Sequence, residues 1–248
     1  MLITPSFLSS PWKLAPATIV HVGGHHAEEF DDYLNLGWGS EGVLWVEAME
    51  EASAVIRERI EGRDEQRVVT TVVWSESGQT VEFRETSNGQ SSSVLELKDH
   101  SLHYPDIVVT RSQEKVTSTL EEIINWDAMP QVGLLNLDIQ GAELHALRGL
   151  GNKIERVQAI YSEVNVQELY TGCPLLGDLD HWLKERGFTR IALELTEQGW
   201  GDGLWLRSDR LPRTWRWTLF QERASTWVRT QAIKAAGKLE GIRRPTQA

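Results

Sequence analysis

The sequence contains one cysteine and no long apolar run. Because Cys173 is alone, a disulfide framework and a cysteine-rich zinc site are both excluded. No apolar run approaches the roughly 20 residues that span a membrane as a helix. Residues 1–17 lack the basic start and continuous apolar stretch of a signal peptide. We therefore expect a cytoplasmic location.

Basic residues are scarce in most of the chain. The formal net charge is −11, divided into −17 over residues 1–207 and +6 over residues 208–248. An acidic body repels nucleic acid, so we expect no nucleic-acid partner and a neutral or cationic ligand. The basic tail carries tryptophan and arginine at helical spacing. We expect it to pack on the acidic body or to form a homodimer, with an anionic membrane surface or another partner as alternatives.

Short apolar runs alternate with helical patterns in the first part of the chain. Strands are predicted at 18–22, 42–48 and 67–74, with helices at 25–37 and 50–62 between them. This alternation indicates parallel strands joined by crossover helices. The remaining predicted strands are 79–85, 132–140, one within 155–165, 188–196 and 204–207, the last two antiparallel. The remaining predicted helices are 142–151, 175–187 and 117–126, the last with Thr117 or Ser118 as N-cap and Glu121 in a capping box.

A nucleoside site is predicted where the first two strands end. Gly23 follows the first strand, and Glu47 lies 24 residues later at the end of the second, where a carboxylate can accept both ribose hydroxyls. A dinucleotide also needs glycines for its pyrophosphate, but His25 and Glu28 stand at the second and third positions of the G-x-G-x-x-G pattern. S-adenosylmethionine has no phosphate and carries cationic groups, so it suits this turn better than NAD or FAD. An NAD-dependent dehydrogenase or epimerase, a non-catalytic nucleoside-binding module and a plain tight turn are the alternatives.

Several segments resemble one enzyme family. VHVGGHHAEE, VLWVEA, NLDIQGAELHALRGLG, YSEVNVQELYTGC and GWGD are similar to the FkbM family of S-adenosylmethionine-dependent methyltransferases over residues 18–207. The most specific segment is Asp138–Gly149. His21 and Ala27 depart from the family pattern, which often has an acid and a glycine there. The chain also resembles the saccharide O-methyltransferases of mycobacterial polymethylated polysaccharides.

This resemblance implies a fold, a cofactor and an acceptor class. The fold is α/β, a class I methyltransferase (Rossmann-like) seven-stranded, mostly parallel sheet with helices on both faces. We expect an arm at 1–17, the methyltransferase domain at 18–207 and a helical tail at 208–248. The activity is O-methylation of a saccharide or a sugar-bearing acceptor. The expected cofactor-binding residues are Gly23, Gly24, His25, Glu28, Glu47, Ala48, Trp74, Ser75, Ser93 and Asp138.

A sugar hydroxyl needs a general base or a metal before it attacks a methyl group. The candidates for the catalytic groups are Asp138, His145 and Glu163, with Asp202 as a further candidate base. In the alternative route, Asp138, Glu163 and Asn165 bind Mg²⁺ at the ends of adjacent strands.

The acceptor is predicted to meet aromatic faces and carboxylates. Trp200 and Asp202 lie in a glycine-flanked turn, 196–203, where an indole can stack on a sugar ring and a carboxylate can accept its hydroxyls. The expected substrate residues are Tyr104, Glu163, Asn165, Tyr170, Trp200 and Asp202.

Other polar residues have plainer interpretations. We expect His21 to be a hydrogen-bonded core histidine, Glu143 to accept bonds from loop backbone, and Cys173 to be a small buried residue. His25 and His26 are adjacent at a predicted helix start, where side chains diverge, so the sequence does not favour a metal there.

Overall fold

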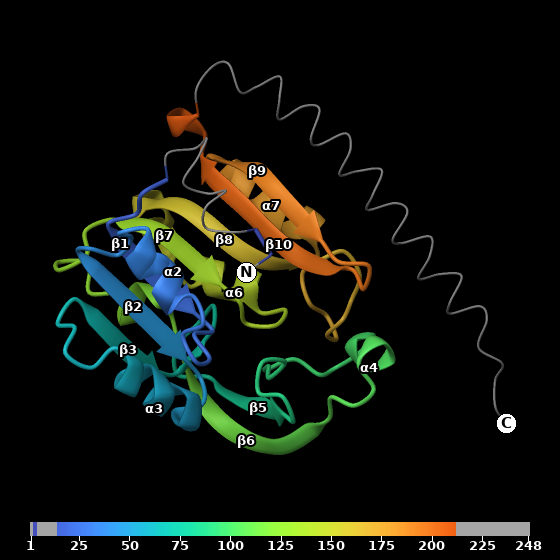
Figure 1. Cartoon of the computed structure of the whole chain (residues 1–248). Helices are drawn as coiled ribbons and strands as arrows, with labels where there is room; N and C mark the ends of the chain where they lie inside the picture. Colours follow the sequence, from blue (N-terminus) through green and yellow to red (C-terminus); the bar gives the residue numbers. More distant parts are fainter. Residues whose placement is uncertain (1, 4–13, 212–248) are drawn as a thin grey trace, which may run out of the picture.

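A seven-stranded sheet forms the centre of the molecule in the computed structural model, which describes residues 2–3 and 14–211 (Figure 1). Its strands run in the order β3-β2-β1-β7-β8-β10-β9. The first five are parallel, whereas β10 is antiparallel to both of its neighbours. The predicted seven-stranded, mostly parallel sheet is confirmed. The bounds are β1 (Thr18–Val22), β2 (Gly42–Glu47), β3 (Gln66–Thr70), β7 (Val132–Leu137), β8 (Val157–Asn165), β9 (Phe188–Leu195) and β10 (Trp200–Arg207).

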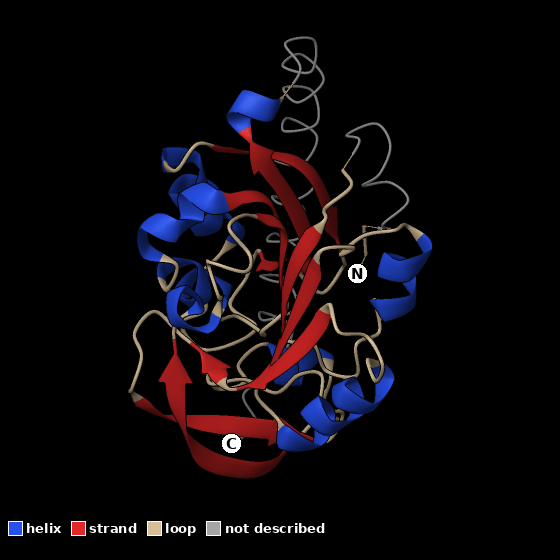
Figure 2. Cartoon of the chain, turned by 90° about the vertical axis from the view of Figure 1, so that its left-hand side faces the viewer, coloured by secondary structure: helices blue, strands red, loops and turns tan. Residues whose placement is uncertain are grey.

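Helices cover both faces of this sheet (Figure 2). Every residue of β1, β2 and β7 is buried, because parallel strands joined by crossover helices are covered on both sides. On one face α2 (Phe30–Asn35) and α3 (Glu50–Arg59) contribute to the core. On the other, α5 (Leu120–Ile123), α6 (Glu143–Arg148) and α7 (Leu176–Glu185) do so. One short 3-10 turn, Gly151–Arg156, precedes β8, and a second, Ser208–Arg210, follows β10.

Two tryptophans of the sheet are fully buried. The Trp45 indole N–H donates to Gln66 Oε1 at 2.9 Å, and that of Trp205 donates to Asp180 Oδ1 at 2.9 Å. Each indole therefore buries a large apolar area while its single donor is satisfied.

A second, three-stranded sheet changes two predicted elements. It consists of β4 (Val72–Val73), β5 (Thr80–Thr86) and β6 (Val109–Ser118), and α4 (His100–His103) lies between β5 and β6 in the chain. The predicted strand 67–74 is divided at Thr71, whose N–H donates to the Glu47 carbonyl before the chain turns to pair with β6. The predicted helix 117–126 is shortened to α5, because its first two residues, Thr117 and Ser118, belong to β6. The N-cap of α5 is Thr119, whose side chain accepts from the Glu122 N–H.

Two loops also differ from their predicted forms. The helix predicted at 25–37 is limited to α2, because His25 and Ala27 have left-handed φ values of 40° and 53° that no helix can contain. The turn predicted at 196–203 is shorter, since β10 begins at Trp200. Gly201 is required there for close packing, because a Cβ at this position would lie 2.0 Å from the Glu194 carbonyl oxygen.

The ends of the chain fall mostly outside the described residues. This applies to most of the predicted arm at 1–17 and to 212–248 of the predicted tail, and so to its proposed helices and homodimer contact. Among the residues that the structure describes, no helix combines the length and apolar character needed to cross a membrane.

Candidate functional site

Two neighbouring cavities open where β1, β2 and β7 end. The wider one has a volume of about 450 Å³. The narrower one lies along the end of β2, and both share one set of lining residues. The shared residues are Gly23, His25, Gln90, Asp138 and Gln140. Ligands of open α/β sheets bind at this end of the strands, so the cavities are the candidate site.

Gly23 brings the end of β1 against the end of β7. Its φ is +83°, and a Cβ built on it would lie 1.8 Å from the Asp138 carbonyl oxygen. The Asp138 N–H donates to the Val22 carbonyl at 3.0 Å, which fixes the same junction. Only glycine permits this approach, and the junction forms the floor shared by both cavities.

Glu47 lies at the end of β2 with its carboxylate held by two backbone groups. Its Oε2 accepts from the His25 N–H at 2.8 Å, and Oε1 accepts from the Met49 N–H at 2.8 Å. Burial raises the pKa of Glu47. Each oxygen can accept a second bond, so the carboxylate can take two ribose hydroxyls. Val46, Val73 and Ile139 give the narrower cavity apolar walls that suit an adenine ring.

Most of the residues predicted to bind a cofactor lie around the two cavities. The narrower cavity is lined by Gly23, His25, Glu47, Ala48, Ser93 and Asp138, and Glu28 lines the wider one. Gly24 is buried against Trp45 and Ile56. The loop that carries Ser93 is tied to the site, because the Ser93 hydroxyl donates to the Gln140 carbonyl at 2.9 Å.

Trp74, Ser75 and His145 are placed elsewhere. The Trp74 and His145 rings stack, with centroids 3.8 Å apart and planes 7° apart. None of the three is among the described residues that line the two cavities. Burial lowers the pKa of His145. The stack packs the segment after β4 against α6, which is a structural role.

Asp138 and Glu163 are brought together on the wall of the wider cavity. Gln140 Nε2 donates to Asp138 Oδ1 at 2.8 Å and to Glu163 Oε2 at 2.6 Å. The Tyr170 hydroxyl donates to Gln140 Oε1 at 2.5 Å and so fixes the orientation of this amide. Burial, followed by the charge of Asp138, raises the pKa of Glu163 well above its ordinary value. Burial and the neighbouring carboxylate thus favour the protonated form of Glu163.

The arrangement does not suit the predicted magnesium site. An N–H donor of Gln140 lies between the carboxylates of Asp138 and Glu163, where the cation would need acceptors only. Asn165 is buried beneath the site, with both polar side-chain atoms unpartnered, and is not among the described residues that line the cavity. These three residues therefore do not converge on one ion.

Aromatic and acidic side chains form the far wall of the wider cavity. Trp200 and Asp202 pair in register with Asn165 and Glu163 of β8. The Trp200 indole N–H donates to the Tyr104 hydroxyl at 2.9 Å. Asp202 accepts from the Leu2 N–H at 2.5 Å and from the Tyr161 hydroxyl. Burial raises the pKa of Asp202.

The plainer interpretations of three residues are confirmed. His21 is 2% exposed and its Nδ1 lies 3.1 Å from the Tyr33 hydroxyl, although the residue also borders the wider cavity. Glu143 Oε1 accepts from the N–H groups of Ile139 and Gly141, each at 3.1 Å. Cys173 is buried.

Sequence reasoning missed Gln140 and His100. Gln140 connects both carboxylates to Tyr170, and its place two residues after Asp138 in the D-I-Q-G segment could have indicated it. His100 lies on α4, borders the wider cavity and contacts the Ser91 hydroxyl through Nε2 at 3.2 Å. No pattern around His100 distinguishes it from an ordinary loop residue.

Comparisons with known proteins agree with this geometry. The model of the methyltransferase FkbM domain matches residues 21–190. No curated protein sequence matches the chain. The FkbM methyltransferase structure from Methylobacillus flagellatus superposes with a TM-score of 0.51 and 14% identity, over 76% of this chain and 43% of that one. The chain thus spans less than half the length of that relative.

A second solved structure supports the fold alone. Streptococcus pneumoniae Sp1610, to which tRNA (m1A22) methylation is ascribed, has a TM-score of 0.54 and 14% identity, over 100% of this chain and 91% of that one. The family match covers more than half of the sequence, and the cavities lie where that fold binds its ligands. The chain belongs to the FkbM methyltransferase family.

Proposed function

We propose that the protein methylates a hydroxyl group of a neutral or amine-bearing saccharide. The observation that carries this proposal is the composition of the wider cavity. Aromatic side chains and carboxylates line it, and Lys and Arg are absent from its described lining residues. Such a wall suits sugar rings and hydroxyl donors, and it repels phosphate-bearing acceptors. Nucleic acids are therefore disfavoured as substrates.

The cofactor would bind along both cavities. Glu47 would accept the ribose hydroxyls, and the apolar wall beside Val73 would contact the adenine. Asp138 and the negative charge of Glu28 would lie toward the cationic end. When bound, S-adenosylmethionine supplies an electrophilic methyl group on a sulfonium, so the protein has only to align the acceptor oxygen and to remove its proton.

Asp138 is the proposed base. Burial raises the pKa of Glu163 and so favours its protonated form, whereas Asp138 is exposed to the cavity that it lines and can reach the acceptor hydroxyl. Gln140 holds both carboxyl groups through one amide, which leaves oxygen lone pairs of Asp138 for the acceptor hydroxyl. His145 is a weaker candidate, because it stacks on Trp74 away from the described cavity walls.

The acceptor proposal is tested by methyl transfer with the full chain. Donor labelled on its methyl group is offered with neutral oligosaccharides, amino-sugar oligosaccharides, sugar phosphates and tRNA. Label is expected in the first two as an alkali-stable ether. The Trp200→Leu variant is expected to raise KM for the saccharide about tenfold, while Glu197→Gln, in the exposed turn before β10, leaves it unchanged. Label confined to tRNA or to sugar phosphates would refute the proposal.

The base is tested separately with two isosteric variants. Asp138→Asn is expected to lower kcat by about 10²–10⁴, the usual contribution of a general base. Glu163→Gln keeps a neutral group in place, so a loss of about tenfold or less is expected. If Glu163→Gln abolished turnover and Asp138→Asn did not, the two roles would be reversed.

A further inference from the structure

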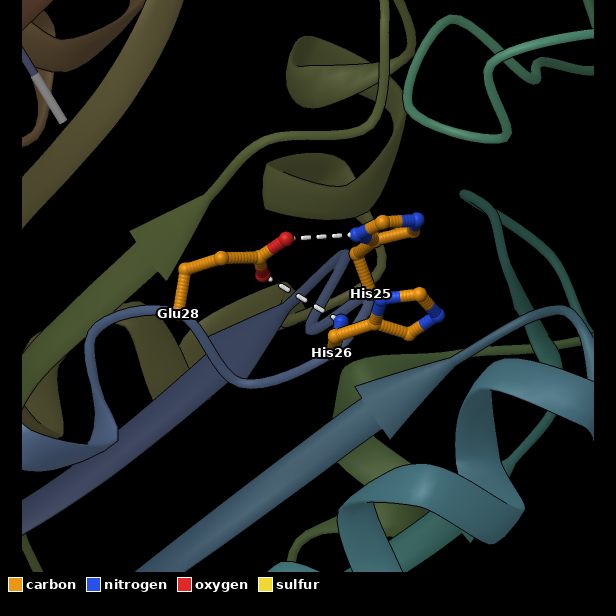
Figure 3. A group of neighbouring side chains, drawn as sticks. All are labelled: His25, His26 and Glu28. Carbon is orange, nitrogen blue, oxygen red and sulfur yellow. Dashed lines mark hydrogen bonds and ion pairs between the residues drawn. The ribbon is translucent and has the colours of Figure 1, made fainter.

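A second group of ligand-type side chains lies at the rim of the wider cavity. His25, His26 and Glu28 come together on the loop between β1 and α2 (Figure 3). One ligand atom from each lies within 4.8 Å of the other two. Within the described part of the chain, which contains all seven histidines, no other group of three His, Cys, Asp or Glu residues is this close.

The loop conformation explains why two adjacent histidines lie side by side. Left-handed φ values at His25 and Ala27 turn the chain twice within three residues. The two imidazole rings consequently stack, with centroids 3.9 Å apart and planes 25° apart. The divergence expected for neighbours at a helix start is therefore wrong here, since α2 begins only at Phe30.

Hydrogen bonds already hold the carboxylate against the histidines. Glu28 Oε1 lies 2.6 Å from His25 Nδ1, and Oε2 accepts from the His26 backbone N–H at 3.2 Å. Arg59 donates to the His26 carbonyl at 3.1 Å and also pairs with Asp31, which ties the loop to α3. The backbone that carries all three side chains is thus fixed before any ligand binds.

Two imidazoles and one carboxylate are a recognised donor set for zinc. Three such ligands leave one coordination position open, as in catalytic zinc sites. Imidazole nitrogen also favours zinc and other late transition metals over Mg²⁺. To reach bonds of about 2.0–2.1 Å, the exposed His26 ring would turn its edge toward the ion. The proton between His25 and Glu28 would leave to solvent.

We propose that His25, His26 and Glu28 bind one divalent transition-metal ion of the zinc class at the rim of the cavity. His25 and Glu28 also line the cavity, so the ion would lie beside the cofactor. It would replace the negative charge of Glu28 with a net positive one. The site is separate from Asp138 and Glu163, and the proposal is independent of which acceptor is methylated.

The experiment measures metal binding without cofactor or acceptor. The full chain, free of any affinity tag, is titrated with Zn²⁺ against a chromophoric chelator. One ion per chain is expected, and His26→Ala and Glu28→Gln are each expected to weaken the affinity at least about tenfold, since each removes one of three ligands. The matched control is His181→Ala, because His181 is an exposed histidine 3.4 Å from Glu185 on α7. The Zn²⁺ affinity of His181→Ala should equal that of the parent protein.

A second measurement keeps the test independent of folding. Co²⁺ replaces Zn²⁺, and its visible absorption reports nitrogen and oxygen ligation directly. The bands should appear with the parent and with His181→Ala, and they should be lost with His26→Ala, whose circular dichroism should match that of the parent because His26 is exposed. No stoichiometric binding, or equal affinities for the parent, His26→Ala and Glu28→Gln, would overturn the proposal.

Discussion

Replacing Gly23 with alanine should destabilise the protein more than any ordinary loop substitution. A left-handed backbone costs a non-glycine residue about 1–2 kcal/mol. The added Cβ would also lie 1.8 Å from the Asp138 carbonyl oxygen, whereas ordinary contacts begin at 3.4 Å, and this oxygen belongs to the backbone and cannot rotate away. Overpacking of this kind costs roughly a further 1–3 kcal/mol. The free energy of unfolding should therefore fall by about 2–5 kcal/mol.

Gly78 provides a matched control for the backbone part of this cost. Its φ is +77°, close to the +83° of Gly23, but a Cβ there would meet nothing within 4 Å. Gly78→Ala should lower the free energy of unfolding by only about 1–2 kcal/mol. Urea unfolding with a slope of about 3 kcal/mol per molar would separate the two midpoints by roughly 0.3–1 M. Equal midpoints would show that the β1–β7 junction is not packed as tightly as described.

Two further predictions concern buried carboxyl groups. Glu47→Gln should weaken the binding of S-adenosylhomocysteine about tenfold by calorimetry, because an amide has only one acceptor oxygen and cannot accept a hydrogen bond from each ribose hydroxyl. Exposed Glu41→Gln is the control, and unchanged binding in both variants would refute the ribose role. Burial raises the pKa of Glu143 to about 7. A carboxyl group whose pKa is higher in the folded than in the unfolded state stabilises the protein at low pH, and this stabilisation is lost as the pH rises from the unfolded to the folded pKa. Unfolding free energy should therefore fall between about pH 4.5 and 7 through this group, and Glu143→Gln should reduce that fall. If the variant kept the full pH dependence, Glu143 would not be the titrating residue.

The central sheet could be predicted from sequence because its strands are continuous apolar runs. β1, β2 and β7 are buried on both faces, and such strands have few alternatives in a soluble protein. β6 was missed because its residues are mostly polar and its last two, Thr117 and Ser118, resemble the start of a capped helix. It is a strand because β5 pairs with it along its length, which is a long-range contact that local propensity does not contain.

The position of the candidate site was more predictable than its contacts. Glu47 and Glu163 lie at or near the ends of β2 and β8, and Asp138 follows β7, so the parallel sheet brings all three to one edge. Which of them are linked depends on Gln140, whose amide donates to both Asp138 and Glu163. The D-I-Q-G spacing places Gln140 near Asp138, but the left-handed φ of +56° at Gln140 and the bond from its amide to Glu163 of β8 are not contained in the local sequence.

Left-handed backbone at a residue other than glycine also explains how the loop after β1 can resemble a dinucleotide loop and yet exclude phosphate. His25 occupies the second glycine position of that pattern, and its φ of +40° shows that the backbone still follows a path that favours glycine. The difference lies in the side chains. The His25 ring lies against Glu28, where a pyrophosphate would need bare N–H groups, and the His25 N–H already donates to Glu47. Burial raises the pKa of Glu28, but the hydrogen bond from His25 outweighs burial and lowers this pKa to about 2, so the Glu28 carboxylate is negatively charged at neutral pH. In the metal-free protein, a loop with this backbone and this charge favours a nucleoside that ends in cations, which is what a sulfonium cofactor offers.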